Sequence, residues 1–277
     1  MGAPSRSPQL EHWHRCDAPV TAQRRCRWQM LSMTISLRVL TLNTWGLPWP
    51  ISSVSPTRRY PLLARFLRER AFDVAALQEV WRGTPGLDVQ GMTRPDHGTS
   101  GLALASPHRV EVVRNRRYGR RRLLPFGDKG VLHTRIFVDD TPITILNTHL
   151  QAYASAKDAR SRARQTDIAL EEAQAVDGPV ILLGDFNFYE DSAVDRASVD
   201  RITRAGFHDS LGERPPQPTF HHTSETERFD RIFVRDGGGH RFHVDDHHVE
   251  HWRFGRHRLP FLSDHLAVEV ALTLTPG

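Results

Sequence analysis

An α+β fold built on mixed β-sheets is the fold class that the sequence predicts, and three observations predict it. Short apolar runs rich in β-branched residues recur along the chain and are typical of strands. Helical periodicity occurs between some of these runs. Three consecutive runs, at residues 109–113, 131–138 and 143–148, have no helix between them, which predicts antiparallel hairpins. A purely parallel, doubly wound sheet is disfavoured because each of its crossovers needs a helix or about a dozen residues.

Each element follows from its local pattern. The strands are predicted from short apolar runs bounded by turn residues. The helices are predicted from apolar side chains that recur every three or four positions; in residues 60–70, four of them, Leu62 included, share a face opposite Arg65 and Arg68. The predicted strands are residues 37–43, 74–78, 101–105, 131–138, 143–148, 180–184, 229–234 and 265–272, and the predicted helices are residues 60–70, 155–175 and 192–205.

Length and composition predict one globular domain. The 277 residues are 39% hydrophobic and 25% charged, which is enough for a sizeable core and typical neither of a disordered nor of a membrane-spanning chain. No Pro-, Gly- or Ser-rich linker interrupts residues 36–274, so we expect a single domain there. Residues 1–33 are interpreted as a disordered tail or a mis-assigned start. They contain the only two cysteines, so no disulfide framework is expected.

The charge of the chain sets a weak constraint on its partners. The net charge is +5, and residues 1–33, with five Arg against one Glu and one Asp, contribute +3 of it. The rest of the chain is therefore close to neutral, which permits an anionic partner without requiring one. The N-terminal residues contain no apolar run of signal-peptide length, which favours a cytoplasmic location.

Polar side chains stand where several of the predicted strands end or begin. Each taken singly also fits a turn, a cap or an ion pair. Buried charge is costly unless it is paired or metal-bound, so the whole set favours a common site. The set comprises Asn43, Glu79, His149, Asp185 and Asn187 at strand ends, and Asp230, Asp264 and His265 at strand starts.

The chemistry of these side chains indicates hydrolysis of a phosphate ester. Oxygen ligands without cysteine favour a hard divalent cation, Mg²⁺ with Mn²⁺ as a substitute, over zinc. Two His residues with a neighbouring Asp supply an acid–base pair near neutral pH. Metal, base and proton donor together suit attack of water on a phosphate.

Six short motifs occur in an order that resembles the endonuclease/exonuclease/phosphatase superfamily. The resemblance covers about residues 36–274 and implies an α/β sandwich of two packed mixed β-sheets flanked by helices, a deoxyribonuclease-like four-layer architecture. It also implies Mg²⁺-dependent cleavage of phosphate esters. The motifs are Leu-Asn-Thr-Trp at 42–45, Leu-Gln-Glu-Val at 77–80, Asn-Thr-His-Leu at 147–150, Gly-Asp-Phe-Asn at 184–187, Phe-Asp-Arg-Ile-Phe-Val at 229–234 and Ser-Asp-His at 263–265.

This resemblance implies a role for the metal-binding and basic residues. Glu79 resembles the principal metal ligand, with Asn43 beside it. Asp264 is expected to contribute through the metal or through hydrogen bonds. His265 resembles the general base, and Asp230 resembles the carboxylate that orients it.

The remaining site residues resemble groups that hold the phosphate and the water. Asp185 and Asn187 resemble the pair that positions the attacking water and holds the phosphate. His149 resembles the second His, which binds or protonates the phosphoryl group as the leaving group departs. The implied step is in-line attack by water.

Within the superfamily the chain is most similar to neutral sphingomyelinases, on residues 43–48, 77–81 and 147–152. Gly-Asp-Lys-Gly at 127–130 resembles a loop near the site of that family, so Lys129 is expected to bind a phosphate oxygen; an exposed turn lysine is the alternative. The resemblance implies release of phosphocholine from a choline phospholipid. Lipid is favoured over nucleic acid as the substrate, with a peripheral membrane contact, and we expect a monomer.

Three other functions stay open. Phe-Asp-Arg-Ile at 229–232 is closer to pancreatic-type deoxyribonucleases, which favours a nuclease acting on DNA or RNA. A phosphoinositide phosphatase and an inactive binding module are the other two functions.

Two further segments stand out by their composition. A His-rich stretch at 221–257 is interpreted as mostly solvent-facing, with Trp252 and Phe254 as lipid contacts. The basic cluster, interpreted as a solvated loop or as a contact for nucleic acid or an anionic membrane, consists of Arg114, Arg116, Arg117, Arg120, Arg121 and Arg122.

Overall fold

The computed structural model describes residues 34–47, 55–81, 87, 89, 91–95, 100–119, 128–220, 227–250 and 262–277. Residues Thr34–Gly277 form one compact unit. Residues 1–33, interpreted above as a tail or a mis-assigned start, lie outside the described residues. In the described part of the chain, no helix is both long and apolar enough to cross a membrane.

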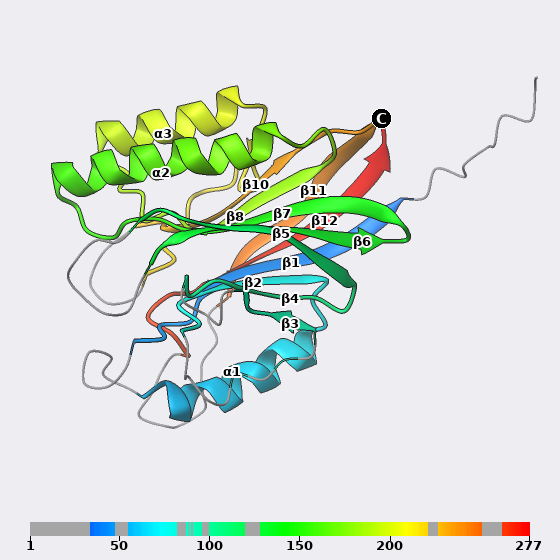
Figure 1. Ribbon diagram of the computed structural model, residues 1–277, viewed down its shortest axis with the longest axis horizontal. Helices are drawn as coiled ribbons and strands as arrows, with labels where there is room; N and C mark the ends of the chain where they lie inside the picture. Colours follow the sequence, from blue (N-terminus) through cyan, green and yellow to red (C-terminus); the bar gives the residue numbers. More distant parts are fainter. Residues whose placement is uncertain are drawn as a thin grey trace, which may run out of the picture. The chain divides into compact units, whose positions relative to one another are not determined.

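Two six-stranded sheets lie at the centre of this unit (Figure 1). The first has the strand order β11-β12-β1-β2-β4-β3, and the second has the order β5-β6-β7-β8-β10-β9. The pairs β1–β2 and β7–β8 are parallel, and the other pairs are antiparallel, which confirms the predicted mixed sheets. The strands of the first sheet are β1 (Ile35–Asn43), β2 (Val74–Gln78), β3 (Met92–Thr93), β4 (Ala103–Ala105), β11 (His240–Glu250) and β12 (Ala267–Pro276). Those of the second are β5 (Arg109–Arg117), β6 (Gly130–Val138), β7 (Thr141–His149), β8 (Val180–Asp185), β9 (His208–Asp209) and β10 (Asp230–Arg235).

Helices cover the outer faces of both sheets, so the unit has four layers (Figure 1). Helix α1 (Pro56–Arg70) packs on the first sheet through an apolar cluster that includes Tyr60 and Leu63. Helices α2 (Ala156–Gln174) and α3 (Ala193–Arg204) cover the second sheet. A third apolar cluster, with Val39 and Ile145 among its members, lies between the two sheets. The predicted α/β sandwich, deoxyribonuclease-like in its layers, is therefore confirmed.

Local sequence explains where several elements begin and turn. Ser155 caps α2, because its hydroxyl accepts a hydrogen bond from the backbone N–H of Asp158 at 3.2 Å. The β6–β7 hairpin turns at Asp139 and Asp140, whose φ angles of 46° and 63° are those of a two-residue hairpin loop. In α1, the buried face differs from the predicted one, since Leu62 is 41% exposed.

The prediction for the charged segment was wrong, and His247 is an exception to the prediction for the His-rich segment. The described arginines of the basic cluster lie in strand β5 and not in a loop, while residues 120–122 lie outside the described residues. Residues 240–250 form β11, where a bulge between Val244 and Asp246 shifts the inward-facing positions by one residue. His247 is therefore buried, with Ser210 Oγ at 3.0 Å from its Nδ1. Trp252 and Phe254 lie outside the described residues.

Candidate active site

The carboxyl ends of the two parallel strand pairs meet at one place. Asn43 ends β1, Glu79 directly follows β2, and Asp185 ends β8. The Asn43 amide Nδ2 donates to Asp185 Oδ2 at 3.0 Å and to Glu79 Oε1 at 3.2 Å. One buried amide therefore joins the polar ends of both sheets.

Asp185 lies at the centre of this group. Its Oδ2 is 3.1 Å from His149 Nε2 and 3.9 Å from His265 Nε2, and its Oδ1 accepts the Asn187 backbone N–H at 3.1 Å. Burial opposes ionisation of Asp185, but the two His residues outweigh burial and hold its pKa below the usual value. Asn187 also donates from Nδ2 to the carbonyl of Leu150 at 3.2 Å.

His265 and Asp230 form a buried pair beside Asp185. Asp230 Oδ2 is 2.8 Å from His265 Nδ1, which leaves Nε2 facing Asp185. Burial lowers the pKa of His265, but Asp230 and Asp185 outweigh burial and raise it to about 10. Thr219 Oγ1 accepts the backbone N–H of Asp230 at 3.0 Å, and the Phe220 ring lies 5.0 Å from the imidazole. The sequence did not single out Thr219 and Phe220, because they belong to none of the motifs quoted above.

The site offers oxygen atoms that can hold a cation. Glu79 Oε2 is buried and has no hydrogen-bond partner among the residues that the structure describes. Asp264 is half-buried and is linked to Asn43 through Ser263, whose Oγ donates to the Asn43 carbonyl at 2.6 Å and to Asp264 Oδ1 at 3.3 Å.

A second set of metal-compatible atoms overlaps the acid–base residues. Asp185, Asp230 and His265 each have a ligand atom within 4.8 Å of the others. In this set Asp230 already engages His265 at hydrogen-bond distance, and Asp185 is bonded by Asn43 and His149. The unpartnered Glu79 oxygen is the better candidate for a metal ligand.

Lys129 reaches the same site from the start of β6. Its ammonium contacts His149 Nε2 and donates to the Leu150 carbonyl at 2.6 Å. Burial lowers the pKa of Lys129 to about 8, while Asp185 and Glu79 oppose that shift. The alternative of an exposed turn lysine is therefore wrong.

A buried polar link beneath the site joins the two sheets. Gln78 Nε2 donates to Asn147 Oδ1 at 2.8 Å, and Asn147 Nδ2 donates to the carbonyls of Leu77 and Ala103 at 3.0 and 2.9 Å. Gln78 directly precedes Glu79, and Asn147 stands two residues before His149. Both residues belong to motifs quoted above, but only the tertiary structure shows that they meet.

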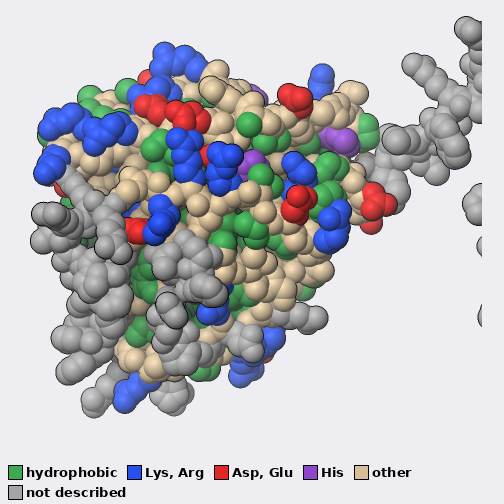
Figure 2. Space-filling view, viewed as in Figure 1, with side chains coloured by type: hydrophobic (Ala, Val, Ile, Leu, Met, Phe, Trp, Pro, Cys, Tyr) green, Lys and Arg blue, Asp and Glu red, His purple; other side chains and the backbone are tan. Residues whose placement is uncertain are grey.

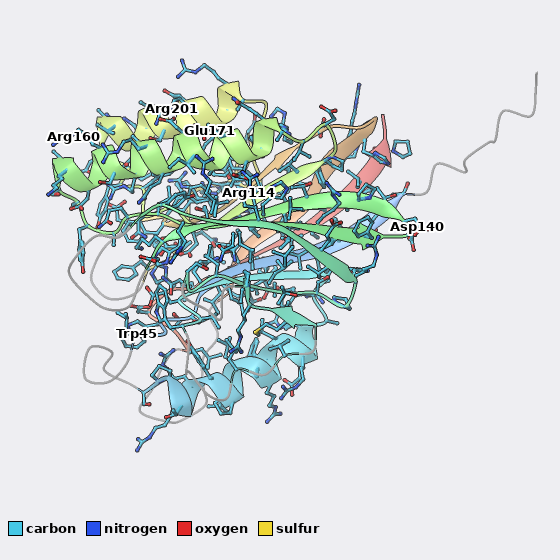
Figure 3. The ribbon with its side chains drawn as sticks, viewed as in Figure 1. Trp45, Arg114, Asp140, Arg160, Glu171 and Arg201 are labelled. Carbon is cyan, nitrogen blue, oxygen red and sulfur yellow. The ribbon has the colours of Figure 1, made fainter. Side chains whose placement is uncertain are left out.

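Backbone strain gathers around the site. Non-glycine residues with positive φ include Trp45 at 51°, Glu79 at 59°, Tyr153 at 76° and Asn187 at 50°. Each lies within four residues of, or is itself, a site residue. Such angles cost about 1 kcal/mol or more each and persist where surrounding contacts impose them. Figure 3 labels Trp45, whose carbonyl is bonded by Arg59 Nη2.

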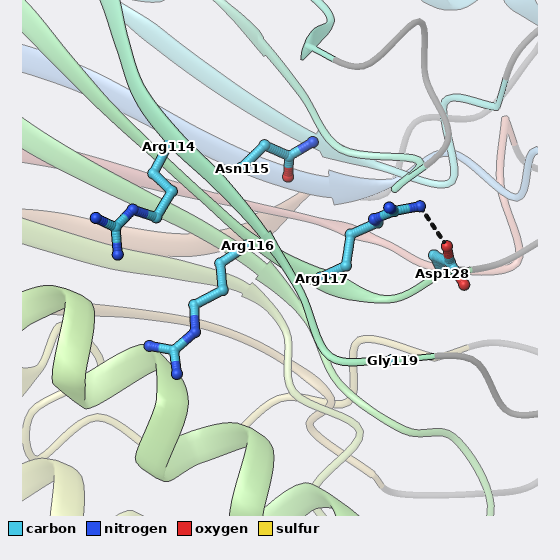
Figure 4. Close-up of a pocket in the computed structure, with 6 residues that line it drawn as sticks. All are labelled: Arg114, Asn115, Arg116, Arg117, Gly119 and Asp128. Atoms are coloured by element: carbon cyan, nitrogen blue, oxygen red, sulfur yellow. Dashed lines mark hydrogen bonds and ion pairs between the residues drawn. The ribbon is translucent and has the colours of Figure 1, made fainter.

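The described arginines of the basic cluster are paired. Arg114 and Arg116 lie 3.3 and 3.4 Å from the buried Glu172, and Arg117 lies 2.9 Å from Asp128. With Asn115, Gly119 and Asp128 they line an open depression of about 750 Å³ (Figure 4). The positive charge of the basic cluster is therefore largely balanced by carboxylates within the described residues.

Two packed mixed sheets with carboxylates and two His residues at the strand ends are the arrangement that the resemblance in the sequence implied. The chain belongs to the Endonuclease/Exonuclease/phosphatase family, whose model matches residues 40–265. Members of this family hydrolyse phosphoesters.

Three relatives illustrate the range of that family. The chain is 27% identical over 177 residues to a Caenorhabditis elegans protein named "Putative neutral sphingomyelinase", an alignment that covers 54% of this chain and 41% of that protein. D. rerio TDP2, solved with a single-strand DNA product, is 17% identical with a TM-score of 0.66 over 86% of this chain and 98% of that one. The mannosyl-6-phosphatase Bt3783 of Bacteroides thetaiotaomicron is 19% identical with a TM-score of 0.65 over 85% and 99%. The two solved structures support the fold alone.

Proposed function

We propose that this protein is a Mg²⁺-dependent phosphodiesterase that releases phosphocholine from a choline phospholipid, as a sphingomyelinase does. The observation that carries the proposal is the contact between Lys129 and His149. The Gly-Asp-Lys-Gly sequence that resembles sphingomyelinases thus delivers a cation to the acid–base residues. The similarity to the C. elegans protein points to the same substrate class.

The protein's own groups can move the proton and hold the phosphate. Asp230 orients His265 through Nδ1, so Nε2 is the atom that accepts a proton from water. Asp185 and Asn187 position the water and the phosphate. His149, with Lys129 beside it, donates a proton toward the leaving oxygen and offsets negative charge.

The donor set fits a hard divalent cation. Glu79, with its unpartnered buried oxygen, is the principal ligand, and Asn43 and Asp264 complete the set. When bound, Mg²⁺ or its substitute Mn²⁺ supplies positive charge that stabilises the phosphate oxygens and lowers the pKa of His265 by repulsion.

The proposal is tested by hydrolysis of sphingomyelin in detergent micelles with Mg²⁺. We expect turnover in the wild type and a loss of about 10²-fold or more in Glu79→Gln and His265→Ala. His243→Ala, at an exposed position of β11, is the matched control and should retain activity. Turnover that persists in both site variants would contradict the assigned roles.

A nuclease is the second candidate, and the fold shared with a DNA-bound TDP2 is the observation that favours it. Plasmid DNA, an abasic duplex, RNA and a phosphoinositide therefore accompany sphingomyelin in the same assay. Cleavage of a nucleic acid without cleavage of sphingomyelin would replace the lipid substrate. No turnover of any of them would favour an inactive binding module.

A further inference from the structure

The first half of α2 carries three basic side chains on one face. Lys157, Arg160 and Arg164 are exposed, and their spacing of three and four residues aligns them. Figure 3 places Arg160 near one end of α2, and Figure 2 shows Lys and Arg side chains gathered over the same end. Tyr153, just before the helix, is 71% exposed. We call these four residues the α2 patch.

The positive charge of the α2 patch is not balanced by the described residues. Lys157, Arg160 and Arg164 have no carboxylate partner among them; Arg164 bonds only Ser161 Oγ, at 3.4 Å. Farther along the helix, by contrast, Glu171 pairs with Arg116 at 2.8 Å. Uncompensated charge thus lies at the N-terminal half of α2.

One cation and the tyrosine of the α2 patch each reduce the stability of the folded chain. Lys157 is in the first turn of α2, where the partial positive charge of the helix N-terminus repels a cation. Tyr153 has a φ of 76°, which a β-carbon makes unfavourable. The Tyr153 backbone is held by Arg162, which bonds its carbonyl, but neither the Lys157 nor the Tyr153 side chain has a polar contact among the described residues. Both side chains are therefore left exposed, which favours a function outside the folded chain.

The α2 patch borders the active site. Leu150, whose carbonyl oxygen is bonded by two site residues, lies three residues before Tyr153, a span of at most about 11 Å. Arg162 Nη1 donates to the carbonyls of Gln151 at 3.0 Å and Tyr153 at 2.6 Å. Arg162 is itself held by a buried ion pair with Asp195 at 2.6 Å. Tyr153 is therefore held in place at the rim of the site.

We propose that the α2 patch docks the enzyme on an anionic lipid surface, with the three cations toward acidic headgroups and Tyr153 at headgroup level. Exposed cations are attracted to anionic leaflets, and a tyrosine, apolar in its ring and polar at its hydroxyl, suits the interface. Nucleic acid attracts the cations equally and can stack on a tyrosine, so lipid is favoured by the similarity to the C. elegans protein on which the proposed function rests. The inference rests on the proposed function, because docking there brings the site to lipid substrates.

The test is co-sedimentation of the full chain with phosphatidylcholine vesicles, with and without phosphatidylserine. We expect binding only when phosphatidylserine is present, and weaker binding at high salt. Arg160→Glu/Arg164→Glu should weaken it about tenfold or more. Arg204→Glu/Arg241→Glu changes the charge equally at exposed positions of α3 and β11 and should bind as the wild type does.

A second pair of variants tests the aromatic contribution. Tyr153→Ala should weaken vesicle binding several-fold, and Tyr153→Phe, which keeps the ring, should retain it. The proposal is overturned if Arg160→Glu/Arg164→Glu binds vesicles as tightly as the wild type, or if both double variants lose binding equally. It is also overturned if these residues govern binding of a single-stranded oligonucleotide and not of vesicles.

Folding and turnover are kept apart from this test. Circular dichroism of each variant shows whether it is folded, and Lys157→Glu, which suits the helix N-terminus, should be at least as stable as the wild type while binding vesicles less tightly. Vesicle binding is measured without turnover. Failure to hydrolyse sphingomyelin in micelles would therefore overturn the proposed substrate and leave the docking result standing.

Discussion

Removing the Asn147 side chain tests how much the buried link between the sheets contributes to stability. Asn147 is 1% exposed, and Asn147→Ala removes the hydrogen bonds to Gln78, Leu77 and Ala103. Each such bond contributes about 0.5–1.5 kcal/mol net, so the loss should be about 2–4 kcal/mol. Gln78 Nε2 keeps its bond to Thr41 Oγ1 at 3.0 Å, which limits the damage on that side.

The measurement is urea unfolding of both proteins, followed by circular dichroism and compared at equal m-value. Asn115→Ala is the matched control, because Asn115 is half-buried at the sheet edge and its amide makes one bond, to Ser100 Oγ at 3.0 Å. We expect it to cost about 1 kcal/mol or less. A loss below about 1 kcal/mol in Asn147→Ala would refute the reasoning that these three bonds tie the sheets together.

Three further predictions concern single buried features. Burial lowers the pKa of His247 to about 4, so the unfolded chain binds a proton more readily than the folded chain does. The free energy of unfolding should therefore fall by up to about 3 kcal/mol from pH 6.5 to pH 4. An unchanged pH dependence of the unfolding free energy in His247→Gln would contradict this. Arg162→Met leaves the Asp195 carboxylate buried without its ion-pair partner and should lower the free energy of unfolding in urea by about 3–5 kcal/mol. The double variant Arg162→Met/Asp195→Leu should recover part of that loss. No recovery would argue against the unpaired buried charge as the cause. Gly184 has a φ of 140°, and a β-carbon there would lie 1.9 Å from the Thr148 carbonyl oxygen. Gly184→Ala should therefore clearly lower the melting temperature. An unchanged melting temperature would show that strand β8 can shift to make room for the β-carbon.

Strand identity and the polar strand ends were readable from the sequence, because both depend on local pattern. A run of apolar residues predicts a buried strand wherever it pairs, and the residues that close such runs, such as Glu79 and Asp185, stand out by their charge. The helices α2 and α3 were predicted because apolar periodicity is also a local pattern, and the structure shows that Ser155 and Ser192 cap them.

Side-chain partners far apart in the sequence were not readable. The strand that includes Arg114 was interpreted as a loop, because its pairing with β6 and with Glu172 is set by the sheet and by α2. His247 is a buried exception in a stretch interpreted as mostly solvent-facing, because a one-residue bulge in β11 reverses which positions face inward.

The sequence by itself determined the family, the layers and the set of polar residues at the strand ends, because motifs and periodicity are local properties. Only the tertiary structure decided that Asn43 bonds Asp185 across the sheets, that Lys129 contacts His149, and that the uncompensated cations lie on α2. These contacts depend on strand order and on which face each helix buries. Both are settled by packing of the whole chain and not by any single segment.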